Sequence, residues 1–87
     1  RTRSMDKLAM VLAFAPPAER LDFALDTARK DATPDPKQPD TRLFRGGPRE
    51  LALMAAVAED LVLARLALAA AQGLLEFSDR HISFKAL

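Results

Sequence analysis

The spacing of apolar residues changes several times along the chain, and each change predicts a new element. Within residues 17–30, Leu21, Leu25 and Ala28 recur at intervals of three and four, which is typical of one face of a helix. Pro17 suits the first helical position, because its fixed φ is helical and its missing N–H would have no partner there. The pattern therefore predicts an amphipathic helix over this segment.

An apolar run, Leu8–Ala15, precedes this helix and predicts another one that Ser4 can cap. Two adjacent prolines separate the two segments, so we expect an N-terminal helical pair over residues 5–30. Residues 1–4 precede the first methionine, and we expect them to be the edge of a fragment or an added sequence.

A different composition follows over residues 31–41, where three prolines and four charged residues occur in eleven positions. This composition is typical of a solvated, extended connector. Its length is unusual for a compact domain, so we expect it either to be poorly ordered or to cross to another subunit. A short strand candidate, Arg42–Phe44, comes next, and Gly46-Gly47 ends it.

Helix-forming residues extend from Pro48 to about Gln72, and Gly73 is placed as a helix stop. Two short β-type runs, 74–77 and 82–85, then flank a polar four-residue turn, which predicts a hairpin. The chain is therefore expected to be mainly α with a small C-terminal β-hairpin. The apolar positions of the hairpin are Leu75, Phe77, Ile82 and Phe84.

From residue 42 onward, the order strand, helix, turn, helix, glycine and hairpin resembles a winged helix-turn-helix. The segment RELALMAAVAEDLVLARL, Arg49–Leu66, is similar to the family's two-helix pattern without a gap. Ala56 stands where the family usually has Gly in the turn, and Ala58 where it often has Ser capping the second helix. The resemblance implies that residues 42–87 form a winged-helix-like unit, with the second helix in the place of a DNA-recognition helix.

The same residues also allow one continuous helix over 48–72, because neither Gly nor Pro occurs between Val57 and Leu61. At 100° per residue, such a helix is apolar almost all round and must be buried on every side. The alternative fold is therefore an all-α helical dimer built on one long helix. Both interpretations remain open at this point.

The outward positions of the second helix indicate what a winged-helix unit would do. A DNA-reading helix presents Arg, Lys, Asn, Gln or Ser to base edges and phosphates. Here those positions hold leucine and alanine, and Arg65 is the only cation between Asp60 and Gln72. The helix therefore looks unlike a DNA reader.

Both folds leave apolar helix surface without a partner inside a chain of 87 residues. Burying such surface contributes about 25 cal/mol per Å², which favours a protein partner. We therefore expect a non-catalytic protein–protein interaction or oligomerisation module, as a homodimer or docked on another protein. A domain that packs on the catalytic body of a larger enzyme is a further interpretation. The predicted interface residues are Leu51, Leu61, Leu63 and Leu68.

The runner-up function is a DNA-binding transcriptional regulator that contacts phosphates through an arginine-rich edge. Cations flank the Gly-Gly turn and recur on the hairpin, so strand pairing could gather them at one edge. The candidate nucleic-acid contacts are Arg42, Arg45, Arg49, Arg80, His81 and Lys85.

Composition narrows the remaining chemistry. The chain has no Cys and a single His, which excludes disulfides and the usual zinc sites. Its net charge of +1 gives no global attraction to nucleic acid or to a membrane. We find no catalytic constellation, no cofactor-binding loop and no evident small-molecule substrate, so we do not expect an enzyme.

The longest apolar stretch, Leu51–Ala71, contains Glu59, Asp60 and Arg65. Each such charge costs about 2.5–3.5 kcal/mol in a membrane-inserted helix, while each Leu contributes only about 0.5 kcal/mol. The stretch is therefore not a membrane span, and we expect the chain to be cytoplasmic.

Overall fold

Helix α2 (Pro17–Asp31) is the first complete element of the computed structural model, which describes residues 14–86. It ends where Ala32 adopts an extended conformation. The predicted amphipathic helix is confirmed, whereas the helix expected ahead of it lies almost wholly outside the described residues. The apolar side of α2 is buried and consists of Leu21, Ala24, Leu25 and Ala28.

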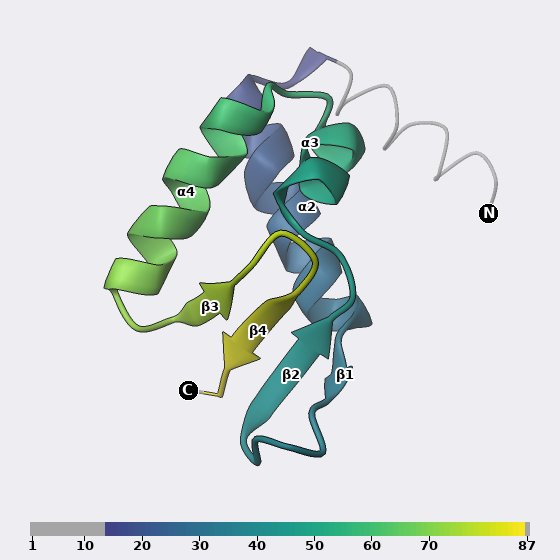
Figure 1. Ribbon diagram of the computed structural model, residues 1–87. Helices are drawn as coiled ribbons and strands as arrows, with labels where there is room; N and C mark the ends of the chain where they lie inside the picture. Colours follow the sequence, from purple (N-terminus) through teal and green to yellow (C-terminus); the bar gives the residue numbers. More distant parts are fainter. Residues whose placement is uncertain (1–13, 87) are drawn as a thin grey trace, which may run out of the picture.

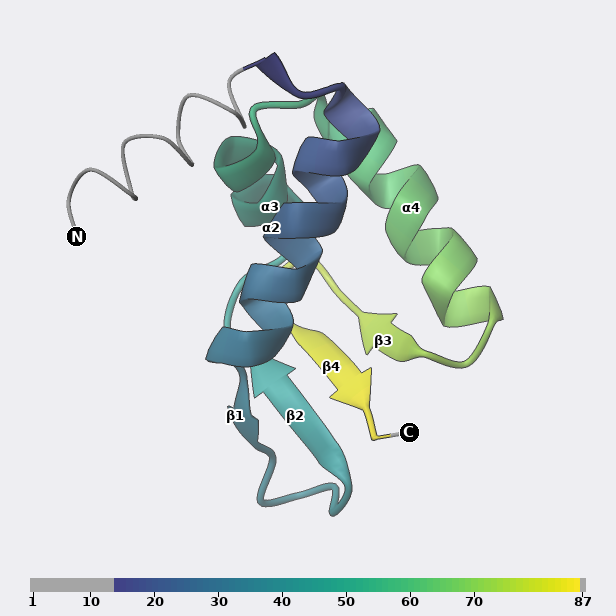
Figure 2. The same ribbon diagram turned by 180° about the vertical axis from the view of Figure 1, so that it is seen from behind.

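Four short strands form one antiparallel sheet in the order β1-β2-β4-β3. Strand β4 lies between β2 and β3, so the strand ahead of the last two helices pairs with the C-terminal hairpin. Figures 1 and 2 show α2 crossing one face of this sheet. The predicted strand and hairpin are both confirmed. The strands are β1 (Thr33–Pro34), β2 (Thr41–Phe44), β3 (Leu75–Phe77) and β4 (Ile82–Lys85).

Side chains alternate between the two faces of the sheet. Ile82 and Phe84 of β4 face the helices and are almost fully buried. Ser83 lies between them in the strand and therefore points to the opposite, outer face. Its register partner Leu43 of β2 points the same way.

Two helices follow β2, and they are separated by a sharp turn rather than joined. Helix α3 (Pro48–Ala55) ends where Ala56 takes the left-handed conformation, with φ 56° and ψ 49°. The N–H of Val57 bonds the oxygen of Ala52, and the N–H of Ala56 bonds that of Leu53. This pair of bonds is the Schellman motif that ends many helices. Helix α4 (Glu59–Ala71) then begins after the extended Ala58.

The alternative of one helix over 48–72 is therefore wrong, and core packing gives the reason. Leu51 of α3 and Leu66 of α4 belong to the same buried cluster. In a continuous helix these two residues would be about 22 Å apart along the axis. The turn folds both apolar sides onto α2 and the sheet.

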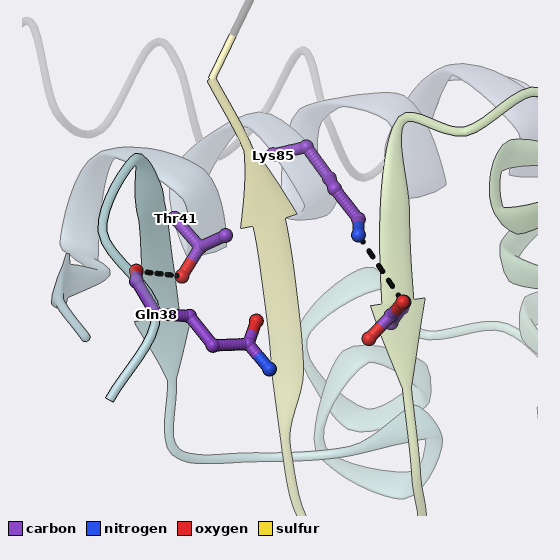
Figure 3. Close-up of polar contacts among 4 residues, drawn as sticks. Gln38, Thr41 and Lys85 are labelled. Carbon is purple, nitrogen blue, oxygen red and sulfur yellow. Dashed lines mark hydrogen bonds and ion pairs between the residues drawn. The ribbon is translucent and has the colours of Figure 1, made fainter. Parts of the chain in front are cut away.

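The proline-rich connector is more structured than its composition indicates. Strand β1 pairs with β2, with Thr33 opposite Leu43. The intervening turn is closed by backbone bonds from Asp35 N–H to Thr41 O and from Thr41 N–H to Gln38 O. The Thr41 hydroxyl also donates to Gln38 O at 2.7 Å (Figure 3). The connector is thus an outer hairpin of the sheet, and Pro34 lies on its edge strand β1, where a missing N–H is tolerated.

Candidate protein interface

Helix α4 has one buried side and one exposed side. Val62, Leu66 and Ala69 are at most 3% exposed and point into the core. At 100° per residue, Ala64 and Ala67 lie on the opposite side, and both are exposed. Figure 1 shows α4 along one edge of the molecule. We call the exposed row Ala64, Ala67 and Ala71 the alanine ridge.

Large apolar side chains flank the alanine ridge. Leu61 is 40% exposed and Leu68 is 55% exposed, and their separation of seven positions, about two helical turns, places both on one flank. Leu63 is 38% exposed and lies on the other flank. Three of the four predicted interface residues thus lie on one surface, and together with the alanine ridge they form what we call the α4 surface.

The prediction that Leu51 belongs to the interface is wrong. Its side chain is 0% exposed, because it lies on the inner side of α3 within the core. The exposed apolar residues of α3 are instead Leu53 and Met54, at 75% and 47%. Leu53 lies about 200° around the helix from Leu51, so the burial of Leu51 places Leu53 on the exposed side.

The charges of α4 leave its outer surface without a free cation. The only cation of the helix, Arg65, lies 3.5 Å from a carboxylate oxygen of Asp22 on α2. Glu59 and Asp60 form the first turn, where negative charge complements the helix dipole. The surface is therefore acidic at one end and apolar along its length.

The candidate nucleic-acid contacts on the strands do not share one face of the sheet. Arg42 pairs in register with the buried Phe84, and its guanidinium donates to the backbone oxygen of Ala32. Lys85 points to the outer face, where its ammonium lies 3.1 Å from the Glu76 carboxylate (Figure 3). Both side chains are therefore already engaged, on opposite sides.

The remaining residues of that set are three arginines and His81. Arg45 follows β2 and His81 precedes β4, and both line a groove on the outer face. The turn beside them is closed by the N–H of Ser78, which donates to the oxygen of His81 at 2.9 Å. Arg49 on α3 and Arg80 in the turn are exposed.

The groove has a volume of ≈ 510 Å³, and no pattern in the sequence predicted it. It brings together the connector turn, the outer residues of three strands and the end of the hairpin, which are far apart along the chain. Its lining residues are Asp35, Pro36, Lys37, Leu43, Arg45, Glu76, Phe77, Ser78, His81 and Ser83.

The start of α3 is held against the hairpin turn. A Cβ on Gly47 would lie 2.0 Å from the backbone oxygen of Asp79, so only glycine allows this approach. The N–H of Gly47 donates to the Glu50 carboxylate at 2.7 Å. This hydrogen bond is the main cause that lowers the pKa of Glu50 from its ordinary value of 4.5.

Within residues 14–86, no three His, Cys, Asp or Glu side chains lie close enough to hold a metal ion. In the same range, no helix has the length and apolar character needed to cross a bilayer. Comparison with models of known protein families finds no match for the chain, and comparison with curated proteins finds none either.

Proposed function

We propose that the chain is a winged helix-turn-helix domain that acts as a non-catalytic self-association module through the α4 surface. The observation that carries the proposal is the exposure of Leu61, Leu63 and Leu68 around the alanine ridge. In this proposal, the helix that would read DNA in a relative of this fold contacts protein instead.

The order of elements supports the winged-helix part of the proposal. Helix α2, strand β2, helices α3 and α4, and the β3–β4 hairpin follow one another as that family's order requires. Strand β2 pairs with β4 of the hairpin, as the wing arrangement needs. Ala56 adopts the left-handed conformation at the position where the family usually has glycine.

The chemistry of α4 supports protein contact over DNA contact. Leucine and alanine offer no hydrogen bonds to base edges, and Asp60 at the start of the helix repels phosphate. The only cation, Arg65, is engaged with α2. Apolar side chains of this kind gain free energy only when another apolar surface covers them.

The exposed leucines set the scale of that gain. Full burial of one leucine contributes about 1.5–3 kcal/mol, and the three leucines are still 38–55% exposed. Covering three leucines in each of two copies therefore contributes about 4–8 kcal/mol before the alanines are included. Lost rotational and translational freedom offsets part of this gain, so we expect a dimer whose population depends on concentration.

A second copy of the chain is the partner that fits this surface. A two-fold axis lets each α4 cover the other with the same residues, and the small alanine ridge allows helix axes to approach to about 8 Å. A parallel arrangement would place Asp60 beside its own copy. An antiparallel arrangement with the axis between Ala64 and Ala67 keeps the two Asp60 side chains about 16 Å apart along the helices. The self-association is therefore antiparallel.

Sedimentation equilibrium between about 1 µM and 1 mM tests the proposal, because dissociation constants in this range correspond to binding free energies of about 4–8 kcal/mol. We expect a monomer–dimer equilibrium that Leu68→Glu shifts strongly toward monomer. Leu53→Glu is the matched control, since Leu53 is an exposed leucine on a different helix, α3. A monodisperse monomer over the whole range would overturn the proposal, as would equal weakening by the two variants.

DNA binding is the second candidate, and three exposed arginines favour it. Arg45, Arg49 and Arg80 are exposed, and Gly47, between Arg45 and Arg49, approaches Asp79 in the turn that would be the wing. Repeating the sedimentation experiment with generic duplex DNA at low and high salt separates the two functions. Phosphate contacts would give binding that falls steeply with salt. A dimer indifferent to DNA would support self-association.

A further inference from the structure

The groove on the outer face of the sheet is separate from the α4 surface and has no part in the proposed dimer. Its floor contains Leu43 and Ser83, which are register partners on β2 and β4. Arg45 and His81 close one end, and the connector turn at Asp35–Lys37 forms a wall. Its volume of ≈ 510 Å³ lies within the range of small-molecule sites.

The charges of the groove favour an anion. Of its two carboxylates, Glu76 is paired with Lys85 at 3.1 Å. The other, Asp35, accepts the backbone N–H of Lys37 at 2.9 Å. Arg45 has no comparable side-chain partner among residues 14–86. Its side chain is exposed and lines the groove, so it is accessible to a ligand. A guanidinium so placed is suited to a carboxylate, which it can bind through two parallel hydrogen bonds.

The lining also contains apolar side chains that a bare inorganic ion would leave uncovered. Leu43 lies on the floor and Pro36 also belongs to the lining, as does Phe77, which packs in part against the core. We infer that this groove is a binding site for a small aromatic carboxylate. The carboxylate pairs with Arg45, with His81 and Ser78 beside it, and the flat ring covers Leu43.

A titration with 2-naphthoate, followed by the backbone amide resonances of the full chain, tests the site. We expect saturable shifts at Leu43, Ser83 and His81, with no comparable shifts along α4. Two matched probes separate the contributions. 2-Naphthamide has the same rings without the charge, and inorganic phosphate has charge without the rings. Both are expected to bind at least fivefold more weakly than 2-naphthoate.

Variants then assign the contacts. Arg45→Gln removes the charged partner and should weaken 2-naphthoate binding about tenfold, as expected for loss of a charge-assisted hydrogen-bonded pair. Leu43→Ser should weaken it severalfold by removing the apolar floor. Arg49→Gln is the control, because Arg49 is an exposed arginine outside the groove, and we expect it to leave the affinity unchanged.

Three results would overturn the inference. They are an absence of saturable shifts up to 20 mM 2-naphthoate, equal binding of 2-naphthamide, and equal weakening by Arg45→Gln and Arg49→Gln. Since the readout is confined to the sheet, these results are independent of whether the chain forms a dimer through α4. Failure of the site and failure of the proposed function can therefore be told apart.

Discussion

The guanidinium of Arg20 on α2 donates a hydrogen bond from Nε to the backbone oxygen of Ala55 at the end of α3, at 2.8 Å. A second nitrogen donates to the oxygen of Ala56 at 2.9 Å, and the remaining one to Ala15. The last carbonyls of a helix have no partner within it and form the negative end of its dipole. The Arg20 side chain thus provides hydrogen-bond donors for the carbonyls at the end of α3 and connects them to Ala15, just before α2.

Replacing Arg20 with Met should therefore lower the free energy of unfolding by about 2 kcal/mol, because charge-assisted hydrogen bonds at a helix end are lost. Arg20→Lys should recover only part of this loss, since one ammonium cannot reproduce the planar fork. Urea denaturation at low micromolar concentration measures both variants. Arg49→Met, on the exposed side of α3, should stay within about 0.5 kcal/mol of the original chain. An equal loss in that control would contradict the assigned role of Arg20.

Ala56 occupies the left-handed position of the Schellman turn at φ 56°. This conformation costs a residue with a Cβ about 1–2 kcal/mol, and glycine avoids the cost. Ala56→Gly should therefore raise the free energy of unfolding by about 1 kcal/mol and the melting temperature by about 4–8 °C. Ala18→Gly, at an exposed helical position of α2, should lower both values. A fall in melting temperature for Ala56→Gly would show that the turn is not formed as described.

The same turn explains why the helix break could not be read with certainty from the sequence. Residues 57–61 contain no glycine or proline, and local propensity alone allows a continuous helix. The break is decided by tertiary packing, because Leu51 and Leu66 must both reach one core. Elements with strong local signals, such as α2 after Pro17 and the β3–β4 hairpin, were predictable within one or two residues.

The candidate surfaces were predictable only in part, for a related reason. Leu61, Leu63 and Leu68 follow from helical spacing once the helix is placed, but Leu51 required knowledge of the α3 orientation. The groove could not be predicted, because it depends on the pairing of β1 with β2. That pairing brings residues 35–37 close to the hairpin. It was not predicted, because the composition of the segment is typical of a solvated connector.

The hydrogen bond from Gly47 N–H lowers the pKa of Glu50 below 4.5, so the ionised carboxylate stabilises the folded state. A lowered pKa contributes stability at pH values above 4.5, and this contribution is lost as the pH falls through the pKa of the folded state. The stability advantage of the original chain over Glu50→Gln should therefore shrink between pH 6 and pH 3. Urea denaturation across this range measures it, and NMR titration of the Glu50 carboxyl carbon checks the direction. A pKa above 4.5 would refute the assignment.

The proposed antiparallel dimer can be tested by disulfide cross-linking. The chain has no cysteine, so an introduced thiol is the only one present. With the two-fold axis between Ala64 and Ala67, each of these residues faces the other across the interface. A mixture of Ala64→Cys and Ala67→Cys chains should then form a disulfide-linked heterodimer under mild oxidation, because facing alanine positions bring the Cα atoms within the 4.4–6.8 Å that a disulfide needs. Non-reducing electrophoresis and mass spectrometry identify the product.

Asp60→Cys distinguishes the direction of packing. In the antiparallel dimer, two copies of residue 60 are about 16 Å apart along the axis, far beyond the reach of a disulfide. In a parallel dimer they would be neighbours and would cross-link readily. Rapid cross-linking at residue 60 without cross-linking between residues 64 and 67 would reverse the orientation while leaving self-association intact. Cross-linking at neither position, in chains that sediment as dimers, would move the interface away from α4, and the exposed Leu53 and Met54 of α3 would then be the next surface to test.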